Sequence, residues 1–133
     1  MSKKGILIIG AGGVSRVATV KCAMNIDTFE KITLASRTVS KCESMAADIL
    51  KNQGVKIDVA SVDADNVDEL VKLIEKVNPK LVLNVALPYQ DLTIMDACTK
   101  CGVDYVDTAN YEHPDVAQFE YKLQWARDNQ FKE

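Results

Sequence analysis

The 133-residue sequence lacks the features that mark several large classes of protein. It has no apolar run near the roughly 20 residues that a membrane-spanning helix needs. It has no basic excess either, since 16 Lys and Arg stand against 19 Asp and Glu, for a net charge of −3. Neither a membrane nor a nucleic acid is therefore expected as a partner. Internal repeats, low-complexity segments and linkers are also missing, which predicts one domain over residues 1–133.

The chain has one histidine and four cysteines. The first apolar run is too short for a signal peptide, so reduced thiols and a cytoplasmic location are expected. Cys98 and Cys101 form a CxxC pair on a predicted apolar helix stripe, which favours core packing over a redox or metal site. No second ligand pair has zinc spacing, and no metal site is predicted. His113 precedes Pro114, and a surface turn residue is favoured over a catalytic base.

The residues that are present alternate between two hydrophobic periods. Short β-rich runs are separated by stretches with apolar residues at helical spacing, such as Leu70, Leu73, Ile74 and Val77. The predicted strands span 6–9, 31–36, 56–62, 80–86 and 103–108. Their nearly continuous apolar character is typical of strands buried on both faces. The expected fold class is therefore α/β, a Rossmann-like doubly wound parallel sheet of about five strands with helices on both faces.

The ends of the predicted helices carry recognisable signals. Ser40 and Glu43 have the spacing of a capping box, Pro79 ends the third helix, and Gly102 suits a left-handed C-terminal position after the fourth. A doubly wound domain of this kind has a sixth strand, which is expected at "DNQFKE", where the chain stops. We therefore expect the first domain of a longer protein whose substrate domain is absent here. A complete five-stranded domain is the alternative.

A glycine-rich turn follows the first predicted strand. Gly10-Ala11-Gly12-Gly13-Val14-Ser15 resembles G-x-G-x-x-G/A, with Ser15 as a small third residue that keeps the helix near the strand. Gly10 permits the tight turn, and Gly12 lets a pyrophosphate approach the backbone. Gly13, Val14 and Ser15 open a helix whose N–H groups face the phosphates. The turn predicts dinucleotide binding, with a plain glycine-rich turn as the alternative.

The end of the second predicted strand indicates which dinucleotide is bound. An NAD site usually has Asp or Glu there, whereas this sequence has Ser36-Arg37-Thr38. A guanidinium between two hydroxyls suits the 2′-phosphate of NADP(H) by charge and hydrogen bonding. NADP(H) is the predicted cofactor and NAD(H) the alternative. The other interpretation of Arg37 is a solvated residue at a strand end.

The later strand ends should line the same cleft, because ligands of open α/β sheets lie at the carboxyl ends of the strands. Asp63 and Ala64 follow the third strand, where Asp63 is either an acceptor for the adenine amino group or a turn residue. Ala86, Leu87 and Pro88 follow the fourth strand. They are predicted to form a rigid rim beside the cofactor, although Pro88 has the alternative role of ending the strand.

The end of the fifth strand is predicted to lie near the substrate. Asp107, Thr108 and Tyr111 fall at the nicotinamide end of such a cleft, where they could hydrogen-bond amino or carboxylate groups of a substrate. A polar turn capped by its own side chains is the alternative. The catalytic residues are not identified from the sequence.

Several stretches, in this order and spacing, resemble the N-terminal NADP-binding domain of the saccharopine dehydrogenase family. The resemblance covers residues 6 to about 132, and its bacterial carboxynorspermidine dehydrogenase branch is the most similar. The stretches are "IIGAGGV", "LASRT", "VDADN", "VLNVALPYQDLTIMDAC", "GVDYVDTANYE" and "QWA…FKE".

The resemblance implies an NADP(H)-linked oxidoreductase that acts on a carbon–nitrogen bond. In that family an amine and an aldehyde condense to an imine, which a hydride from the nicotinamide reduces to a secondary amine. The implied partner is a small amine or aldehyde substrate of amino acid or polyamine metabolism. The fragment alone should bind cofactor without turnover, and a homodimer is left open. The alternatives are a nucleotide-sensing module and a domain that resembles shikimate dehydrogenase over "GAGGVSR" and "SRT".

Overall fold

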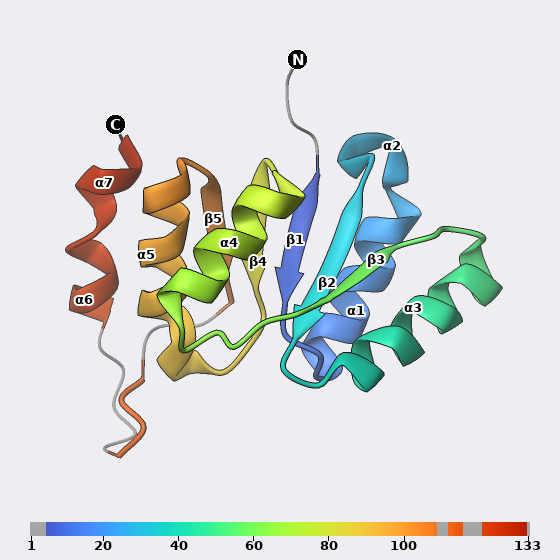
Figure 1. The fold of residues 1–133 in the computed structure, drawn as a ribbon, viewed down its shortest axis with the longest axis horizontal. Coiled ribbons are helices and arrows are strands. Elements are labelled where there is room, and N and C mark those ends of the chain that lie inside the picture. Colours follow the sequence, from blue (N-terminus) through green and yellow to red (C-terminus); the bar gives the residue numbers. More distant parts are fainter. Residues whose placement is uncertain (1–4, 109–111, 116–120, 133) are drawn as a thin grey trace.

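A five-stranded, all-parallel sheet forms the centre of the computed structural model, which describes residues 5–108, 112–115 and 121–132 (Figure 1). The strand order is β3-β2-β1-β4-β5, so β1 has β2 on one side and β4 on the other. The chain adds β2 and β3 on one side of β1 and then adds β4 and β5 on the other side. This change of side is the switch point of a doubly wound sheet, and it confirms the predicted fold class. The strands are β1 (Ile6–Ile9), β2 (Ile32–Ser36), β3 (Asp58–Ser61), β4 (Leu81–Asn84) and β5 (Asp104–Asp107).

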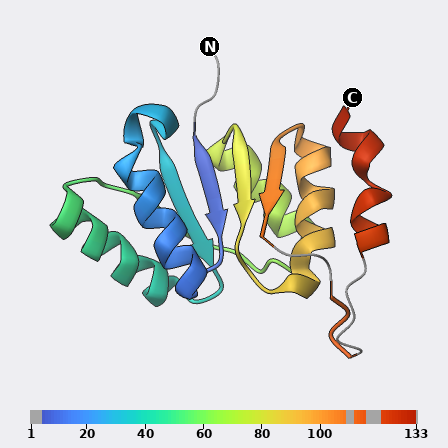
Figure 2. The same cartoon turned by 180° about the vertical axis from the view of Figure 1, so that it is seen from behind.

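Helices cover both faces of the sheet. Figure 1 shows α4 and α5 in front of it, and Figure 2 shows α1 and α3 on the opposite face. Gly102 ends α5 in the left-handed conformation, and Asn78 does the same for α4, directly before Pro79. The helices are α1 (Gly13–Met24), α2 (Ile26–Phe29), α3 (Val39–Gln53), α4 (Val67–Val77), the 3-10 helix η1 (Pro88–Gln90), α5 (Asp91–Cys101), α6 (Tyr121–Trp125) and α7 (Asp128–Lys132).

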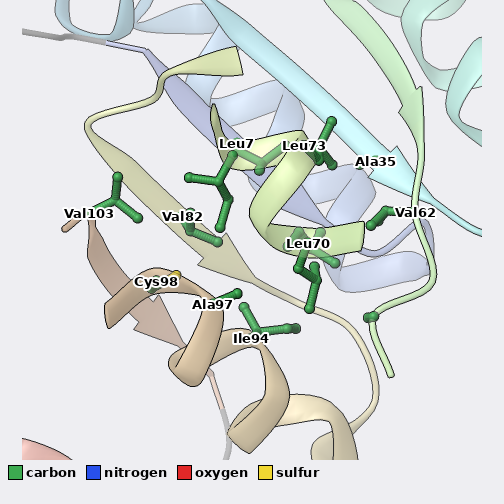
Figure 3. Packing of buried hydrophobic residues seen from close by; sticks show 13 residues of the cluster. Leu7, Ala35, Val62, Leu70, Leu73, Val82, Ile94, Ala97, Cys98 and Val103 are labelled. Atoms are coloured by element: carbon green, nitrogen blue, oxygen red, sulfur yellow. The ribbon is translucent and has the colours of Figure 1, made fainter. Parts of the chain in front are cut away.

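The central strand β1 contributes to two cores because its side chains alternate between the faces. Leu7 and Ile9 pack in the cluster under α4 and α5, part of which is drawn in Figure 3. Ile6 and Ile8 pack in the cluster with α1 and α3. All four residues are buried, as the continuous apolar run predicts for a strand covered on both faces. The two cores hold the carboxyl end of β1 in place, which is where the glycine-rich turn begins.

Three local expectations are wrong. The outer strands β3 and β5 are half-exposed, because a strand at the sheet edge has a neighbour on one side only. The capping box at Ser40 does not form, since α3 begins at Val39 and places Ser40 inside the helix. Residues 128–132 form the helix α7 and not the beginning of a sixth strand. Within the described part of the chain, no helix is long and apolar enough to span a membrane.

Candidate cofactor site

Gly10 is required at the carboxyl end of β1 for two reasons. Its φ of +121° lies in a region that side-chain-bearing residues rarely adopt. A Cβ there would also lie 2.7 Å from the Val85 carbonyl oxygen and 2.9 Å from the Ala86 nitrogen. The sequence predicted the turn, whereas the close approach of the β4 end becomes visible only in the structure.

The two glycines that follow face open space. A Cβ added at Gly12 or Gly13 would meet no atom within 4 Å, so the backbone there is open to approach. Gly12 is the N-cap of α1, no side chain caps the helix, and its first turn holds no acidic residue. The first N–H groups of a helix have no partner within it, and they carry its positive dipole end. The turn therefore fits a pyrophosphate group.

Ser15 is used inside the fold. Its side chain is fully buried, and its Oγ donates a hydrogen bond of 2.5 Å to the carbonyl oxygen of Gly10. This bond ties the first turn of α1 to the end of β1, which agrees with the predicted need for a small residue at this position. Val14 is 60% exposed on the same helix.

A cavity of about 280 Å³ lies at the carboxyl ends of the strands, beside the glycine-rich turn. It brings together eight of the thirteen residues predicted to bind the cofactor. These are Gly10, Gly12, Ser36, Arg37, Thr38, Ala64, Ala86 and Leu87. The other five predicted residues are not in its lining: Gly13, Val14, Ser15, Asp63 and Pro88.

The cavity also contains a second cation that the sequence analysis missed. Lys41, in the first turn of α3, lines it together with Arg37, and both side chains are exposed. No carboxylate is in the lining, so the charge at this end of the cavity is positive. The signal was present in the sequence, since Lys41 follows Arg37 by four residues at the start of a predicted helix. Gln90 is a further lining residue that was not predicted.

Asp63 has the geometry of its alternative role as a turn residue. Its Oδ1 accepts a hydrogen bond of 3.0 Å from the Asp65 N–H, and its own N–H donates to Glu69 Oε2 at 3.2 Å. Pro88 begins η1, where it lines a different hollow together with His113. His113 is half-exposed before Pro114 and accepts a hydrogen bond from the backbone N–H of Asp115 at 3.2 Å.

Side chains from four elements form a polar network at the ends of β4 and β5. Asn84 Nδ2 donates to Asp91 Oδ1 at 2.9 Å and to the Tyr105 hydroxyl at 3.1 Å. The Tyr105 hydroxyl donates to Asp107 Oδ2 at 2.8 Å. Gln124 Nε2 bridges the two carboxylates, at 3.0 Å from Asp91 and 2.9 Å from Asp107. Of the predicted substrate-proximal residues, Asp107 thus lies in this network.

Asp91 is the most unusual member of the network. It is 2% exposed, and burial, with the nearby charge of Asp107, raises its pKa to about 7, although the hydrogen bond from Asn84 opposes this shift. Asp91, Asn84 and Gln124 were not predicted as site residues, because no local pattern shows that β4, α5 and α6 bring these side chains together. Thr108 is exposed, and Tyr111 lies outside the described residues.

Cys98 packs in the core, as predicted for the CxxC pair. It is fully buried on α5, where Figure 3 labels it within the hydrophobic cluster, and burial raises the pKa of its thiol to about 12. Cys101 is half-buried at the end of α5. In the part of the chain that the structure describes, no group of three His, Cys, Asp or Glu side chains could hold a metal ion.

We expect Cys98 to resist labelling by a thiol reagent in the native protein. Its thiol is both inaccessible and protonated at neutral pH, whereas only the thiolate reacts. Mass spectrometry of digested protein would show Cys98 modified after unfolding in urea and unmodified before it. Rapid native labelling at Cys98 would contradict its place in the core.

Comparison with known proteins decides the family. The family model described as "Saccharopine dehydrogenase NADP binding domain" matches residues 6–133. The chain belongs to this family. A carboxyaminopropylagmatine dehydrogenase from Synechocystis sp. is 52% identical over 128 residues, which are 96% of this chain and 31% of that protein. A carboxynorspermidine synthase from Vibrio cholerae is 38% identical over an alignment of 141 positions, gaps included, that covers 96% of this chain and 33% of that protein.

The chain thus spans about a third of the length of these relatives. Among solved structures, apo saccharopine dehydrogenase (L-Glu forming) from Saccharomyces cerevisiae has a TM-score of 0.65 at 22% identity. The match covers 84% of this chain and 22% of the yeast chain. At this identity the likeness shows a shared fold. The family match confirms the resemblance found in the sequence. The chain is the NADP-binding domain of a saccharopine dehydrogenase-like protein.

Proposed function

We propose that this domain holds NADP(H) in the cavity at the carboxyl ends of its strands, as the cofactor-binding part of an oxidoreductase that reduces an imine to a secondary amine. The observation that carries the proposal is the cavity itself. It joins the glycine-rich turn to Arg37 and Lys41, and its lining holds no carboxylate. A 2′-phosphate needs cations at the end of β2, whereas the ribose of NAD is usually bound by a carboxylate there.

In this proposal each end of the cavity binds one part of the cofactor. The backbone of the turn Gly10–Ser15 holds the pyrophosphate at the N-terminus of α1. The 2′-phosphate contacts Arg37 and Lys41, with hydroxyl hydrogen bonds from Ser36 and Thr38. The adenine lies beside Ala64, which lines the cavity.

The other half of the cofactor lies toward β4 and β5. Ala86 and Leu87, which line the cavity, form the rim along which the ribose and nicotinamide extend. Asp107 and Thr108, at the end of β5, lie on the substrate side. NADPH supplies the hydride, and the domain's own residues bind and orient it.

The proposed reaction class rests on the relatives. Both carboxyaminopropylagmatine dehydrogenase and carboxynorspermidine synthase are named for a carboxylated amine, in which a carbon chain is bonded to an amine nitrogen. Reduction of an imine formed from an amine and an aldehyde makes such a carbon–nitrogen bond.

Isothermal titration of the domain with NADP(H) and with NAD(H) tests the cofactor. We expect NADP(H) to bind at least about tenfold more tightly, a difference of about 1.4 kcal/mol. Preference for NAD(H) would contradict the role of Arg37 and favour a nucleotide-sensing module.

An NADPH oxidation assay tests the reaction. It uses a protein that contains this domain and has the full length of the relatives, and it should show NADPH oxidation only when an amine and an aldehyde are both present. Oxidation with the aldehyde alone would contradict imine reduction.

A further inference from the structure

The polar network at the ends of β4 and β5 is connected to the cofactor cavity through Asn84. This side chain is 2% exposed, and both the nitrogen and the oxygen of its amide group form hydrogen bonds. Its Nδ2 donates to Asp91 and Tyr105, while its Oδ1 accepts a hydrogen bond of 2.9 Å from the Ala86 N–H. One buried amide therefore links the network to a residue of the cavity lining.

The segment that Asn84 holds is the one that packs against the glycine-rich turn. The Val85 N–H donates to the Ile9 carbonyl oxygen at 2.9 Å, and the backbone of Val85 and Ala86 fills the place where a Gly10 side chain would be. A shift of this segment would therefore change the cavity wall and press on the turn proposed to bind the pyrophosphate.

Asp91 is also connected to the cavity through its neighbours in the chain, Gln90 and Thr93. Its neighbour Gln90 is 4% exposed and lines the cavity. The Thr93 hydroxyl shares its one proton between two carbonyl oxygens, that of Gln90 at 2.9 Å and that of Ala64 at 2.6 Å. The beginning of α5 is thereby fastened to the wall near β3.

We propose that Asn84 and Asp91 are positioning residues for the cofactor, and that the ionised Asp91 carboxylate holds Asn84, and through it the backbone segment Val85–Leu87, in the binding geometry. The proposal rests on the proposed cofactor site. Neither residue needs to touch the cofactor. Both act through the Ala86 backbone.

The hydrogen-bond inventory explains why the charge on Asp91 matters. Both carboxylate oxygens accept from amide groups, Oδ1 from Asn84 and Oδ2 from Gln124. An ionised carboxylate only accepts, so it satisfies both donors. When Asp91 is protonated, one of its oxygens becomes a donor and faces an N–H group, so one of the two bonds is weakened. In agreement with this, the Asn84 hydrogen bond lowers the Asp91 pKa, which means that it favours the ionised form.

The surroundings of Asp91 place its titration near neutral pH. Among the described groups, β5 brings the Asp107 carboxyl and the Tyr105 hydroxyl toward it, while β4 and α6 bring the neutral amides of Asn84 and Gln124. Burial and the charge of Asp107 raise its pKa to about 7. The segment Val85–Leu87 should therefore keep its binding geometry above this pH, where Asp91 is ionised, and become less ordered below it.

The first test uses the protein without cofactor. In ¹⁵N-resolved NMR spectra, the Ala86 amide signal is expected to titrate with an apparent pKa near 7. The isosteric variant Asp91→Asn should abolish this titration. Asp104→Asn is the matched control on β5, since its exposed ion pair with Lys80 lies at the opposite end of the strand. An Ala86 signal that does not titrate in the wild type would overturn the proposal, whether or not NADP(H) binds.

The second test compares NADPH affinity between wild type and Asp91→Asn at several pH values. The ratio of the two dissociation constants cancels the titration of the ligand's own phosphate. It is expected to be close to one below pH 6 and to rise to about fivefold at pH 8, the value of one hydrogen bond of about 1 kcal/mol. A ratio that stays constant with pH would overturn the proposal. Absence of NADPH binding in the wild type would contradict the proposed function, and the amide titration would still decide the network's role.

Discussion

Replacing Gly10 with alanine is expected to destabilise the domain by at least about 3 kcal/mol, a large part of the stability of a small domain. Two costs combine at this position. A residue with a side chain is strained at a φ of +121°, and the new methyl would lie under 3.0 Å from the backbone of Val85 and Ala86. A backbone neighbour has no flexible end to move aside, so β1 and β4 would have to separate. Urea denaturation of both proteins measures the difference.

Gly12→Ala is the matched control for Gly10→Ala and separates folding from binding. Gly12 has an extended backbone that alanine also adopts, and its added methyl would point into open space. We expect the stability to change by no more than about 1 kcal/mol, the usual cost of an alanine N-cap. The affinity for NADP(H) should fall at least about tenfold, since the methyl occupies the path of the pyrophosphate. Unchanged affinity in Gly12→Ala would contradict the proposed position of the pyrophosphate.

The second large effect concerns cofactor choice. Arg37→Ala should weaken NADPH binding by about 10- to 100-fold, since hydrogen bonds to a charged group contribute about 1.5–3 kcal/mol each. NADH affinity should stay nearly unchanged, because NADH has no 2′-phosphate. Lys41→Ala should have a smaller effect in the same direction, as a single ammonium makes no bidentate contact with a phosphate.

The double variant Arg37→Ala/Lys41→Ala and the control variant Lys51→Ala complete this experiment. Arg37 and Lys41 line the same end of the cavity, so the effects of their substitutions should not be additive. Lys51→Ala, in the last turn of α3, removes an exposed charge from the same helix and should leave both affinities unchanged. Equal losses of NADPH and NADH affinity in Arg37→Ala would show that Arg37 acts on the fold or on the pyrophosphate and not on the 2′-phosphate.

The sequence by itself determined the fold class and the place of the cavity. Alternating hydrophobic periods require strands separated by helices, and the crossover rule makes such strands parallel. The glycine spacing after β1 and the Ser36-Arg37-Thr38 segment after β2 then indicated a dinucleotide and its phosphate. These signals are local, because turn geometry, helix ends and strand period depend on residues close together in the chain.

Only the tertiary structure decided how distant segments meet. Gly10 packs against Val85 and Ala86, and Asp91 meets Asp107 through Gln124, although 33 positions separate Gln124 from Asp91. None of these contacts has a periodic or local signature, since they depend on the order of strands in the sheet and on the docking of α6. The raised pKa of Asp91 has the same origin, because burial and a neighbouring charge are properties of the assembled fold.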